Sequence, residues 1–403
     1  MAEPVIVAAT RSPIGRAAKG SLVDCRPDDL TAQMVKAALA KVPALDPAEL
    51  DDLMLGCGLP GGEQGYNMGR VVAVLAGLDG VPGCTITRYC SSSLQTIRMA
   101  AHAIKAGEGD AFVAAGVECV SRYGKGTSDG LPDTTNPRFA APQERTAKRA
   151  EGGADPWQPA DGLPDIYIAM GHTAENVAEL EDISRTEMDE FAKLSQDRAV
   201  ESQRNGFFAR EISPVTTPDG TVVDSDDGPR PNTMLEKLAE LQPVFRPEGR
   251  VTAGNACPLN DGAAAVVVMS DEKATALGIS PLARVVASGV SALDPEIMGL
   301  GPVEASRQAL ARAGMTIDDV DLVEINEAFA AQLIPSARKL GVEWEKLNVN
   351  GGSIAVGHPF GMTGARIMTT LLNGLQTADA EIGLETMCVG GGQGMAMIVE
   401  RLT

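Results

Sequence analysis

Three stretches of the chain hold residues that could do chemistry, and the first centres on a single cysteine. Cys90 stands between a strand-like run, residues 81–89, and a helical run, residues 91–105. A thiol at the start of a helix faces free backbone N–H groups and the positive end of the helix dipole, which stabilise the thiolate. We therefore expect Cys90 to have a lowered pKa and to act as a nucleophile. The alternative is an unreactive core cysteine, because free cysteines commonly behave as small buried hydrophobes.

The other two stretches supply a base and a loop of backbone donors. Residues 348–361 contain one of only three histidines, His358, in a glycine-dense turn where the backbone can approach a ligand closely. An imidazole in such a turn is placed to act as a base. Residues 387–394 form the end of a strand at Cys388 and a glycine loop that includes Gly390. This loop can aim N–H groups at a developing oxyanion, although a glycine run more often marks a tight turn.

These motifs, taken in order with Asn326 in the run Asn-Glu-Ala-Phe, resemble those of the thiolase family, the acyl-CoA C-acyltransferases. The resemblance covers nearly the whole chain, from Arg-Ser-Pro-Ile-Gly at residues 11–15 to the C-terminal strand. It implies that Cys90 forms an acyl-enzyme and that His358 takes the proton of this thiol. It also implies that Cys388 moves the α-proton of acetyl-CoA.

Negative charge develops on two oxygens in this chemistry, so the resemblance implies two oxyanion holes. The backbone N–H groups of Cys90 and Gly390 are expected to form one of them. A water held by Asn326, together with the side chain of His358, is expected to form the other. A second interpretation of Asn326 is the N-cap of a helix over residues 327–340, because asparagine is favoured at that position. Both interpretations can hold together.

The resemblance also implies where coenzyme A binds. Ala253, Gly254 and Cys257 belong to a run that lies near the pantetheine arm in the family, and Arg230 belongs to a run near the adenine. Many members carry a serine in place of Cys257, so its contact with coenzyme A stays open. A solvated loop arginine is the alternative for Arg230. Short-chain biosynthetic members tend to have a histidine where Ala169 stands, which favours a longer or branched acyl chain here.

The composition excludes several classes of partner. A formal charge of −20 over 403 residues argues against nucleic acid or an anionic membrane, and coenzyme A itself requires a local basic patch. The apolar run at residues 263–269 is too short to cross a bilayer, and no secretory signal is visible. The seven cysteines show no Cys-x-x-Cys pairing. We therefore expect free thiols in a cytoplasmic protein, with no metal and no permanently bound cofactor.

Helical and strand-like runs alternate along the chain, which predicts an α/β protein with mixed sheets covered on both faces. The resemblance implies the thiolase fold, in which two βαβαβαββ halves form a five-layer αβαβα sandwich with an inserted loop domain. We expect a first half over residues 1–120, completed by about 250–270, and a second half over 271–403. The loop domain then spans 121–249, and its Gly- and Pro-rich part at 121–165 covers the site. A homodimer or homotetramer is expected.

The resulting functional expectation is reversible thiolysis of 3-ketoacyl-CoA, or Claisen condensation of an acyl-CoA with acetyl-CoA, by a ping-pong mechanism. Its partners are acyl-CoA, acetyl-CoA and coenzyme A, and the expected setting is the degradation of fatty acids or related lipids. A short-chain biosynthetic thiolase that forms acetoacetyl-CoA is one alternative. A non-catalytic lipid-binding protein with the same fold is another, although the intact set of reactive residues argues against it. Acyl length, a sterol-like substrate and physiological direction stay open.

Overall fold

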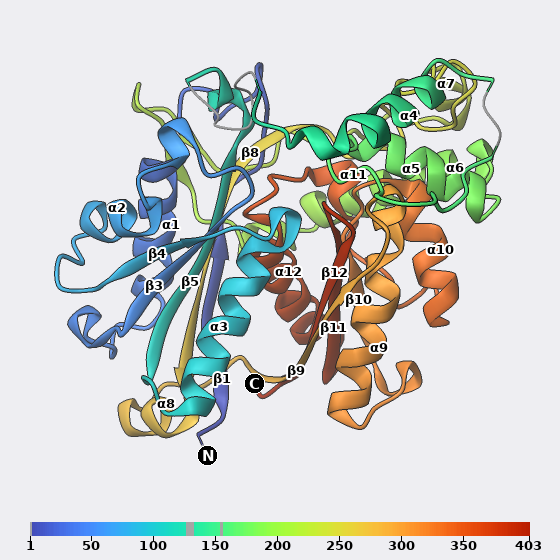
Figure 1. The fold of residues 1–403 in the computed structure, drawn as a ribbon. Coiled ribbons are helices and arrows are strands. Elements are labelled where there is room, and N and C mark those ends of the chain that lie inside the picture. Colours follow the sequence, from blue (N-terminus) through green and yellow to red (C-terminus); the bar gives the residue numbers. More distant parts are fainter. Residues whose placement is uncertain (1, 126–132, 154–155) are drawn as a thin grey trace.

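The computed structural model describes residues 2–125, 133–153 and 156–403, which form five layers (Figure 1). Helices α1 and α2 cover one layer of strands, α3 and α12 lie in the centre, and α9 and α10 cover the second layer of strands. The helices are α1 (Pro27–Ala40), α2 (Met68–Leu75), α3 (Ser92–Ala106), α4 (Ala140–Ala150), α5 (Met170–Leu180), α6 (Arg185–Arg204), α7 (Leu235–Ala239), α8 (Asp271–Leu277), α9 (Gly301–Ala313), α10 (Ala330–Leu340), α11 (Ser353–Val356) and α12 (Thr363–Ala378). The expected five-layer thiolase fold is confirmed.

The strands of the two halves have the same topology. The described strands are β1 (Pro4–Arg11), β2 (Gly15–Arg16), β3 (Asp52–Cys57), β4 (Gly83–Ile86), β5 (Ala111–Cys119), β6 (Val215–Thr216), β7 (Val222–Val223), β8 (Asn260–Ser270), β9 (Ala283–Ala292), β10 (Leu322–Ile325), β11 (Ile382–Val389) and β12 (Gln393–Arg401), of which β6 and β7 pair only with each other. The first half has the order β1-β8-β5-β3-β4, and the second has β9-β12-β11-β10 followed by a bridge from Val323 to Leu347. In both halves the first two pairings are antiparallel and the last two are parallel. The two halves expected from the resemblance are therefore visible as a repeated strand order.

The central strands are buried along their whole length and mostly apolar, because both of their faces are covered. All residues of β8 and β5 are buried, and most of them are alanine or valine. The apolar run at residues 263–269 is thus the middle of a core strand. Within the part of the chain that the structure describes, no helix is long and apolar enough to cross a membrane.

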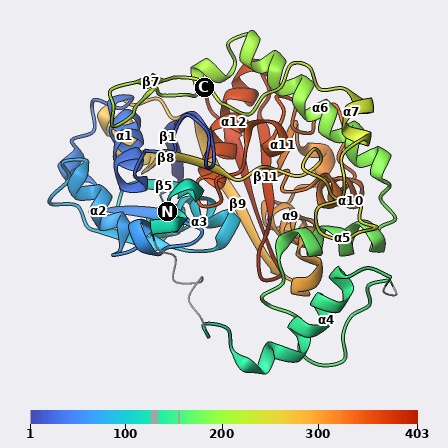
Figure 2. The ribbon, with the colours of Figure 1, turned by 90° about the horizontal axis from the view of Figure 1, so that it is seen from above.

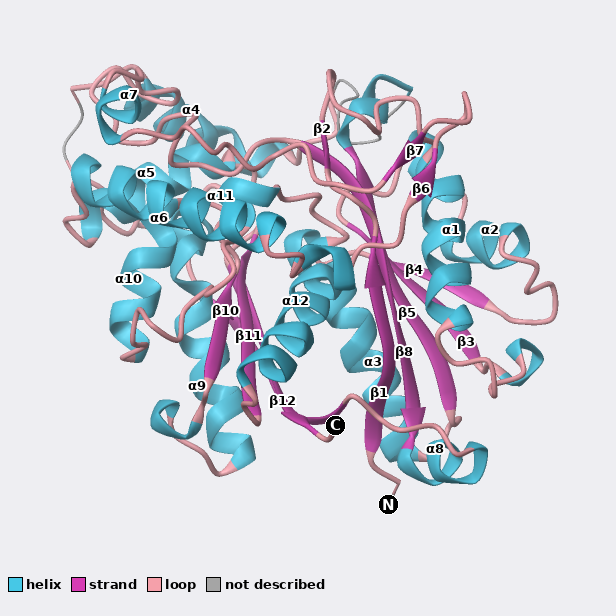
Figure 3. Ribbon diagram, turned by 180° about the vertical axis from the view of Figure 1, so that it is seen from behind, coloured by secondary structure: helices cyan, strands magenta, loops and turns pink. Residues whose placement is uncertain are grey.

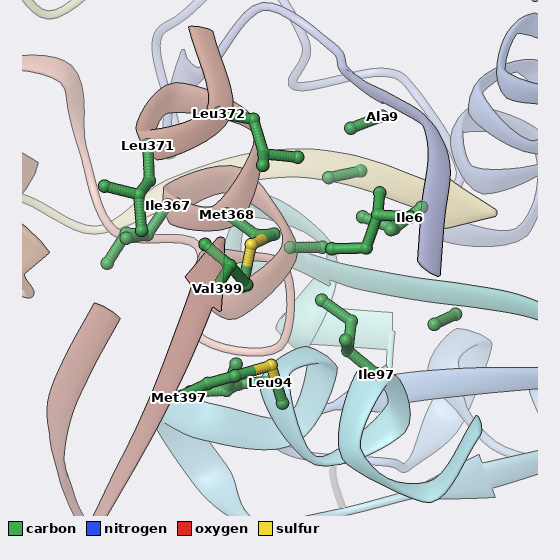
Figure 4. Close-up of a cluster of buried hydrophobic side chains, with 14 of the residues drawn as sticks. Ile6, Ala9, Leu94, Ile97, Ile367, Met368, Leu371, Leu372, Met397 and Val399 are labelled. Atoms are coloured by element: carbon green, nitrogen blue, oxygen red, sulfur yellow. The ribbon is translucent and has the colours of Figure 1, made fainter. Parts of the chain in front are cut away.

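The two central helices approach each other closely at their N-terminal ends. A Cβ atom on Gly364 of α12 would lie 2.3 Å from the backbone nitrogen of Leu94 on α3, so only glycine fits there. Below this contact Ile97, Met368 and Leu371 pack in one buried cluster (Figure 4). Figure 3 shows α12 between the strands of the two halves. This packing sets the turns that precede α3 and α12 beside each other.

The segment between β5 and β8 carries α4 to α7 above the strands (Figures 1 and 2). Helix α6 begins with a capping box, in which the Ser184 hydroxyl and the Glu187 carboxylate each bind the other residue's backbone N–H. Helix α5, which precedes α6, begins at Met170, directly after Ala169. Helix α4 lies within the predicted covering segment, of which residues 126–132 and 154–155 are outside the described residues.

Candidate active site

The catalytic candidates come from turns at one end of the strands. Cys90 lies in the 3-10 turn between β4 and α3, and His358 lies in the turn before α12, which is the equivalent place in the second half. Asn326 follows β10 directly, Cys388 is the penultimate residue of β11, and Gly390 follows that strand. The two halves therefore contribute a cysteine and a histidine from matching positions.

The state of the Cys90 thiol differs from the expectation. Burial raises the pKa of Cys90 to about 12, although the backbone N–H groups of Gly390 and of Cys90 itself lower it in part. The helix start does provide donors, as predicted, but removal of the sulfur from water is the larger effect. The prediction of a lowered pKa is therefore wrong, and at neutral pH the resting group is a thiol.

Three thiols share this site. Burial raises the pKa of Cys388, and the neighbouring Cys90 and Cys257 raise it further. Burial likewise raises the pKa of Cys257, with Cys90 as the next cause. All seven cysteines are free, and in the described ranges no group of His, Cys, Asp or Glu side chains is arranged to hold a metal. Because all three thiols are protonated, a base must come from another side chain.

His358 has the properties of that base. The Thr363 hydroxyl donates its single proton to the Pro359 carbonyl at 2.8 Å, so it must accept from Nδ1–H of His358 at 2.6 Å. Nε2 is then unprotonated and accepts from Nδ2–H of Asn326 at 3.3 Å. Burial and the charge of Arg366 lower the pKa of His358 to about 3. The imidazole is therefore neutral at physiological pH, with Nε2 unprotonated and able to accept a proton.

Asn326 does not cap a helix, so that second interpretation is wrong. Helix α10 begins at Ala330, and its N-cap is Phe329. The chain stays extended because Phe329 bridges Ala256 and because the buried Glu327 carboxylate is held in place. The partners of Glu327 are the Ser195 hydroxyl at 2.6 Å, Asn348 Nδ2 at 2.9 Å and the Ile354 backbone N–H at 3.0 Å. These contacts leave the Asn326 side chain free to reach His358.

Glu118 is a structural residue of the site that the sequence analysis missed. Its buried carboxylate accepts backbone N–H groups from Gly58 at 2.7 Å and from Gly361 at 2.9 Å. It also accepts the Tyr123 hydroxyl at 2.7 Å. Glu118 thereby clamps the turn after β3 to the turn after His358. A lone carboxylate in the apolar strand β5 is the signal that could have identified it.

The coenzyme A candidates divide into two groups. Arg230, Ala253 and Gly254 line one cleft, together with Arg16, which the sequence analysis did not single out. Partial burial and the charge of Arg16 lower the pKa of Arg230, so two cations lie close together in this acidic chain. Cys257 is not part of the cleft lining and lies instead toward the other two thiols. The cleft thus has the local basic character that an anionic ligand requires.

Comparison with known proteins agrees with this geometry. The family profile "Thiolase, N-terminal domain" matches residues 4–272, and "Thiolase, C-terminal domain" matches residues 279–401. The chain is 43% identical to a beta-ketoadipyl-CoA thiolase of Acinetobacter baylyi over 100% of both chains. It is 41% identical to the 3-ketoacyl-CoA thiolase of Bacillus subtilis, over 99% of this chain and 100% of the relative.

A solved structure gives the same result for the fold. The acetyl-CoA acetyltransferase of Bacillus anthracis superposes with a TM-score of 0.86 at 38% identity, covering 100% of this chain and 99% of that one. The profiles, the full-length relatives and the shared architecture lead to one conclusion: the chain belongs to the thiolase family.

Proposed function

We propose that this acyl-CoA C-acyltransferase cleaves 3-ketoacyl-CoA with coenzyme A, reversibly, through an acyl-enzyme on Cys90. One observation carries the proposal. The Cys90 thiol lies against the backbone N–H of Gly390 and beside the Cys388 thiol, in a site whose histidine is neutral with an unprotonated Nε2. Relatives named 3-ketoacyl-CoA thiolase and beta-ketoadipyl-CoA thiolase support the same class of reaction.

In the first half-reaction of thiolysis, the Cys90 sulfur attacks the 3-keto carbon as its proton passes to Nε2 of His358. The bond between C2 and C3 then breaks, and its electron pair forms the enolate of acetyl-CoA. The Cys388 thiol protonates C2, which releases acetyl-CoA and leaves a thiolate on Cys388. A thiol whose pKa is raised suits this step, because it holds its proton until a strong base forms.

In the second half-reaction coenzyme A releases the acyl group. The thiolate of Cys388 takes the thiol proton of coenzyme A, whose sulfur attacks the acyl carbonyl. The bond to the Cys90 sulfur breaks, and His358 returns its proton to Cys90. Condensation runs through the same steps in reverse, and both directions use one site.

Donors for the two oxyanions are available in matching places. The N–H groups of Cys90 and Gly390 face the Cys90 sulfur, where the acyl oxygen would lie. Nδ2 of Asn326 and Nε2 of His358 lie 3.3 Å apart. Once Nε2 has accepted the Cys90 proton, its N–H and that of Asn326, acting directly or through a water, form the proposed site of the enolate oxygen. Each such donor commonly contributes roughly 3 kcal/mol to the transition state.

The inserted segment, residues 121–249, is proposed as the domain that holds coenzyme A and shapes the acyl pocket. Support comes from Arg230 in the cleft and from Met170 at the start of α5, whose sulfur lies 3.6 Å from a Cβ built on Gly390. Ala169 is exposed beside it, which leaves space for a longer acyl chain. The two halves are assigned to residues 1–120, completed by about 250–270, and to residues 271–403.

Degradation of fatty acids or related lipids in the cytoplasm is the proposed setting, and a short-chain biosynthetic thiolase is the alternative. Thiolysis of 3-ketoacyl-CoAs of graded length distinguishes them. We expect kcat/KM for medium-chain substrates to equal or exceed that for acetoacetyl-CoA, since each buried methylene contributes about 0.8 kcal/mol. A marked preference for acetoacetyl-CoA contradicts the proposed open pocket. No turnover of any 3-ketoacyl-CoA would favour the lipid-binding alternative.

A homodimer or homotetramer is proposed from the edge of the first half. Strand β4 ends the strand order and pairs only with β3 among the described residues. Tyr66, Val74 and Leu75 are exposed apolar side chains near this edge, on and before α2. A second copy that pairs along β4 would cover the open edge. Light scattering at micromolar concentration should find no stable monomer, and a monomer would contradict this assembly.

A further inference from the structure

A buried chain of hydrogen bonds approaches His358 from the side opposite Thr363. Nη2 of Arg366 donates to the Ser353 hydroxyl oxygen at 2.7 Å, and that hydroxyl donates to Oδ1 of Asn326 at 2.6 Å. Nδ2 of Asn326 then meets Nε2 of His358 at 3.3 Å. Ser353, Asn326, His358 and Arg366 are each at most 2% exposed. Bulk water therefore does not reach these side chains and cannot replace a hydrogen bond that a substitution removes.

The direction of every bond in this chain is determined by its two ends. A guanidinium can only donate, so the single Ser353 proton is left for Asn326. The amide of Asn326 must then present its oxygen to Ser353 and its N–H to His358. At the far end the Pro359 carbonyl can only accept, which fixes Thr363 and the Nδ1–H tautomer of His358. Arg366 at one end and the Pro359 carbonyl at the other therefore require the same orientation of the Asn326 amide, with Oδ1 toward Ser353 and Nδ2–H toward His358.

The head of the chain is a permanent charge in the interior. Arg366 is buried, and burial lowers its pKa, while the carboxyl groups of Glu211 and Glu327 oppose this shift in part. A guanidinium stays protonated throughout the physiological range. Ser353 consequently has no opportunity to donate toward Arg366 instead of toward Asn326.

The orientation of Asn326 matters once His358 has accepted a proton. Nε2–H then becomes a donor, and an Asn326 amide turned by 180° would accept it through Oδ1. That internal hydrogen bond would remove Nε2–H from the substrate oxygen and would aim Nδ2–H away from it. With the amide held as observed, Nε2–H and Nδ2–H are both donors and neither can bind the other. Both remain available for one developing oxyanion.

We propose that Ser353 is a positioning residue that locks the Asn326 amide in its donor orientation and so keeps both N–H groups available for the enolate oxygen. The inference rests on the proposed function, because it assigns the enolate to Asn326 and His358. Ser353 itself touches no reacting atom. Its hydroxyl acts only through Asn326.

The test compares Ser353→Ala with Ser336→Ala, which removes an equally buried hydroxyl. Ser336 on α10 donates to the Gly299 carbonyl at 3.2 Å and makes no hydrogen bond to Arg366, Ser353, Asn326 or His358. Two rates are measured for each variant: exchange of acetyl-CoA methyl protons with deuterated solvent, and acylation of Cys90 by acetyl-CoA, which forms no enolate and is followed by mass spectrometry. We expect Ser353→Ala to slow exchange by roughly tenfold or more while acylation changes by less than about threefold. Ser336→Ala should change neither rate by more than that.

A spectroscopic readout makes the result independent of turnover. The chain has only three histidines, so the ¹⁵N resonances of His358 can be assigned by comparison with His358→Asn. In the parent the Nε2 resonance should be that of an unprotonated nitrogen that accepts a hydrogen bond. In Ser353→Ala it should move toward the value of a free unprotonated nitrogen, and in Ser336→Ala it should stay. Ser353→Thr, which keeps a hydroxyl donor, should resemble the parent.

Three results would overturn the inference: an unmoved Nε2 resonance in Ser353→Ala, exchange at the parent rate, or exchange and acylation that fall in equal proportion. A Ser353→Thr protein with the parent Tm but the defects of Ser353→Ala would also contradict it. Failure of the proposed function appears differently, as a parent enzyme that is never acylated on Cys90. In that case the resonance of Nε2 still decides whether Ser353 orients Asn326.

Discussion

Glu324 and Glu385 lie directly opposite each other on the parallel strands β10 and β11, both buried. Neither oxygen of Glu385 has a hydrogen-bond partner among the described residues. Burial raises the pKa of Glu324 to about 8, with Arg366 opposing the shift, and burial raises the pKa of Glu385 as well. The pair is therefore largely protonated in the folded protein at a pH where both groups ionise in the unfolded chain.

This relationship predicts a pH-dependent stability. A carboxyl whose folded pKa is raised contributes stability that is complete below its unfolded pKa and is lost as the pH rises through about 8. Glu324→Gln removes this loss, so its unfolding free energy relative to the parent should increase by at least about 1 kcal/mol between pH 5 and pH 9. Denaturant unfolding at both pH values measures the change. Glu304→Gln on the exposed face of α9 is the control, and equal pH dependence in Glu324→Gln and the parent contradicts the assignment.

The reactivity of Cys90 should reflect its raised pKa. Because burial raises the pKa of this thiol to about 12, alkylation of the substrate-free enzyme by iodoacetamide should keep accelerating as the pH rises beyond about 9. Peptide mass spectrometry of the Cys90 peptide gives the rate at each pH, with the denatured chain as reference. A rate that levels off below neutral pH would reveal a preformed pair of thiolate and imidazolium.

The two catalytic cysteines should separate into two steps. Cys388→Ala should still accept an acyl group from acetyl-CoA on Cys90, because His358 rather than Cys388 takes the Cys90 proton. Exchange of the acetyl-CoA methyl protons should fall by about two orders of magnitude or more, since general acid–base catalysis commonly contributes that much. Proton NMR in deuterated buffer measures the exchange. Exchange at the parent rate would show that a residue other than Cys388 removes the α-proton.

Close packing of the central helices predicts unequal effects for two glycines of α12. Gly364→Ala should lower the unfolding free energy by about 2 kcal/mol or more, because its Cβ would meet the Leu94 backbone nitrogen at 2.3 Å. Gly374→Ala should stay within about 1 kcal/mol of the parent, since its Cβ would meet only side-chain ends, a Leu322 methyl at 3.3 Å and Asn350 Nδ2 at 3.6 Å, and alanine favours a helix. Chemical denaturation compares them, and equal destabilisation would show that the close contact does not control the packing.

Much of the fold follows from local pattern. Helix α3 begins within one residue of its predicted start because strand-like residues, a reactive turn and an apolar stripe follow one another in the sequence. The capping box at Ser184 and the Asp46 cap before β3 are also local signals, and both are present. The start of α10 differs because Glu327 is held by residues from α6 and from the segment around Asn348. Contacts between residues so distant in the sequence cannot be inferred from local helix propensity.

The site itself was only partly predictable. Its motif residues were identified from the family resemblance, and the structure brings Cys90, Cys388, Asn326 and His358 to one end of the strands. The pKa of Cys90 could not be derived from helix position, because desolvation depends on layers contributed by the whole chain. Ser353 and Glu118 were missed because their partners are distant in sequence.

The most direct test of the account is the site of covalent acylation. The enzyme is mixed with an acyl-CoA that has no 3-keto group, so that acylation breaks no C–C bond, and intact mass and peptide mapping locate the adduct. The account predicts one acyl group on Cys90 in the parent and in Cys388→Ala, and none in Cys90→Ser. An adduct that persists in Cys90→Ser, or that maps to Cys388 or Cys257 in the parent, would contradict it.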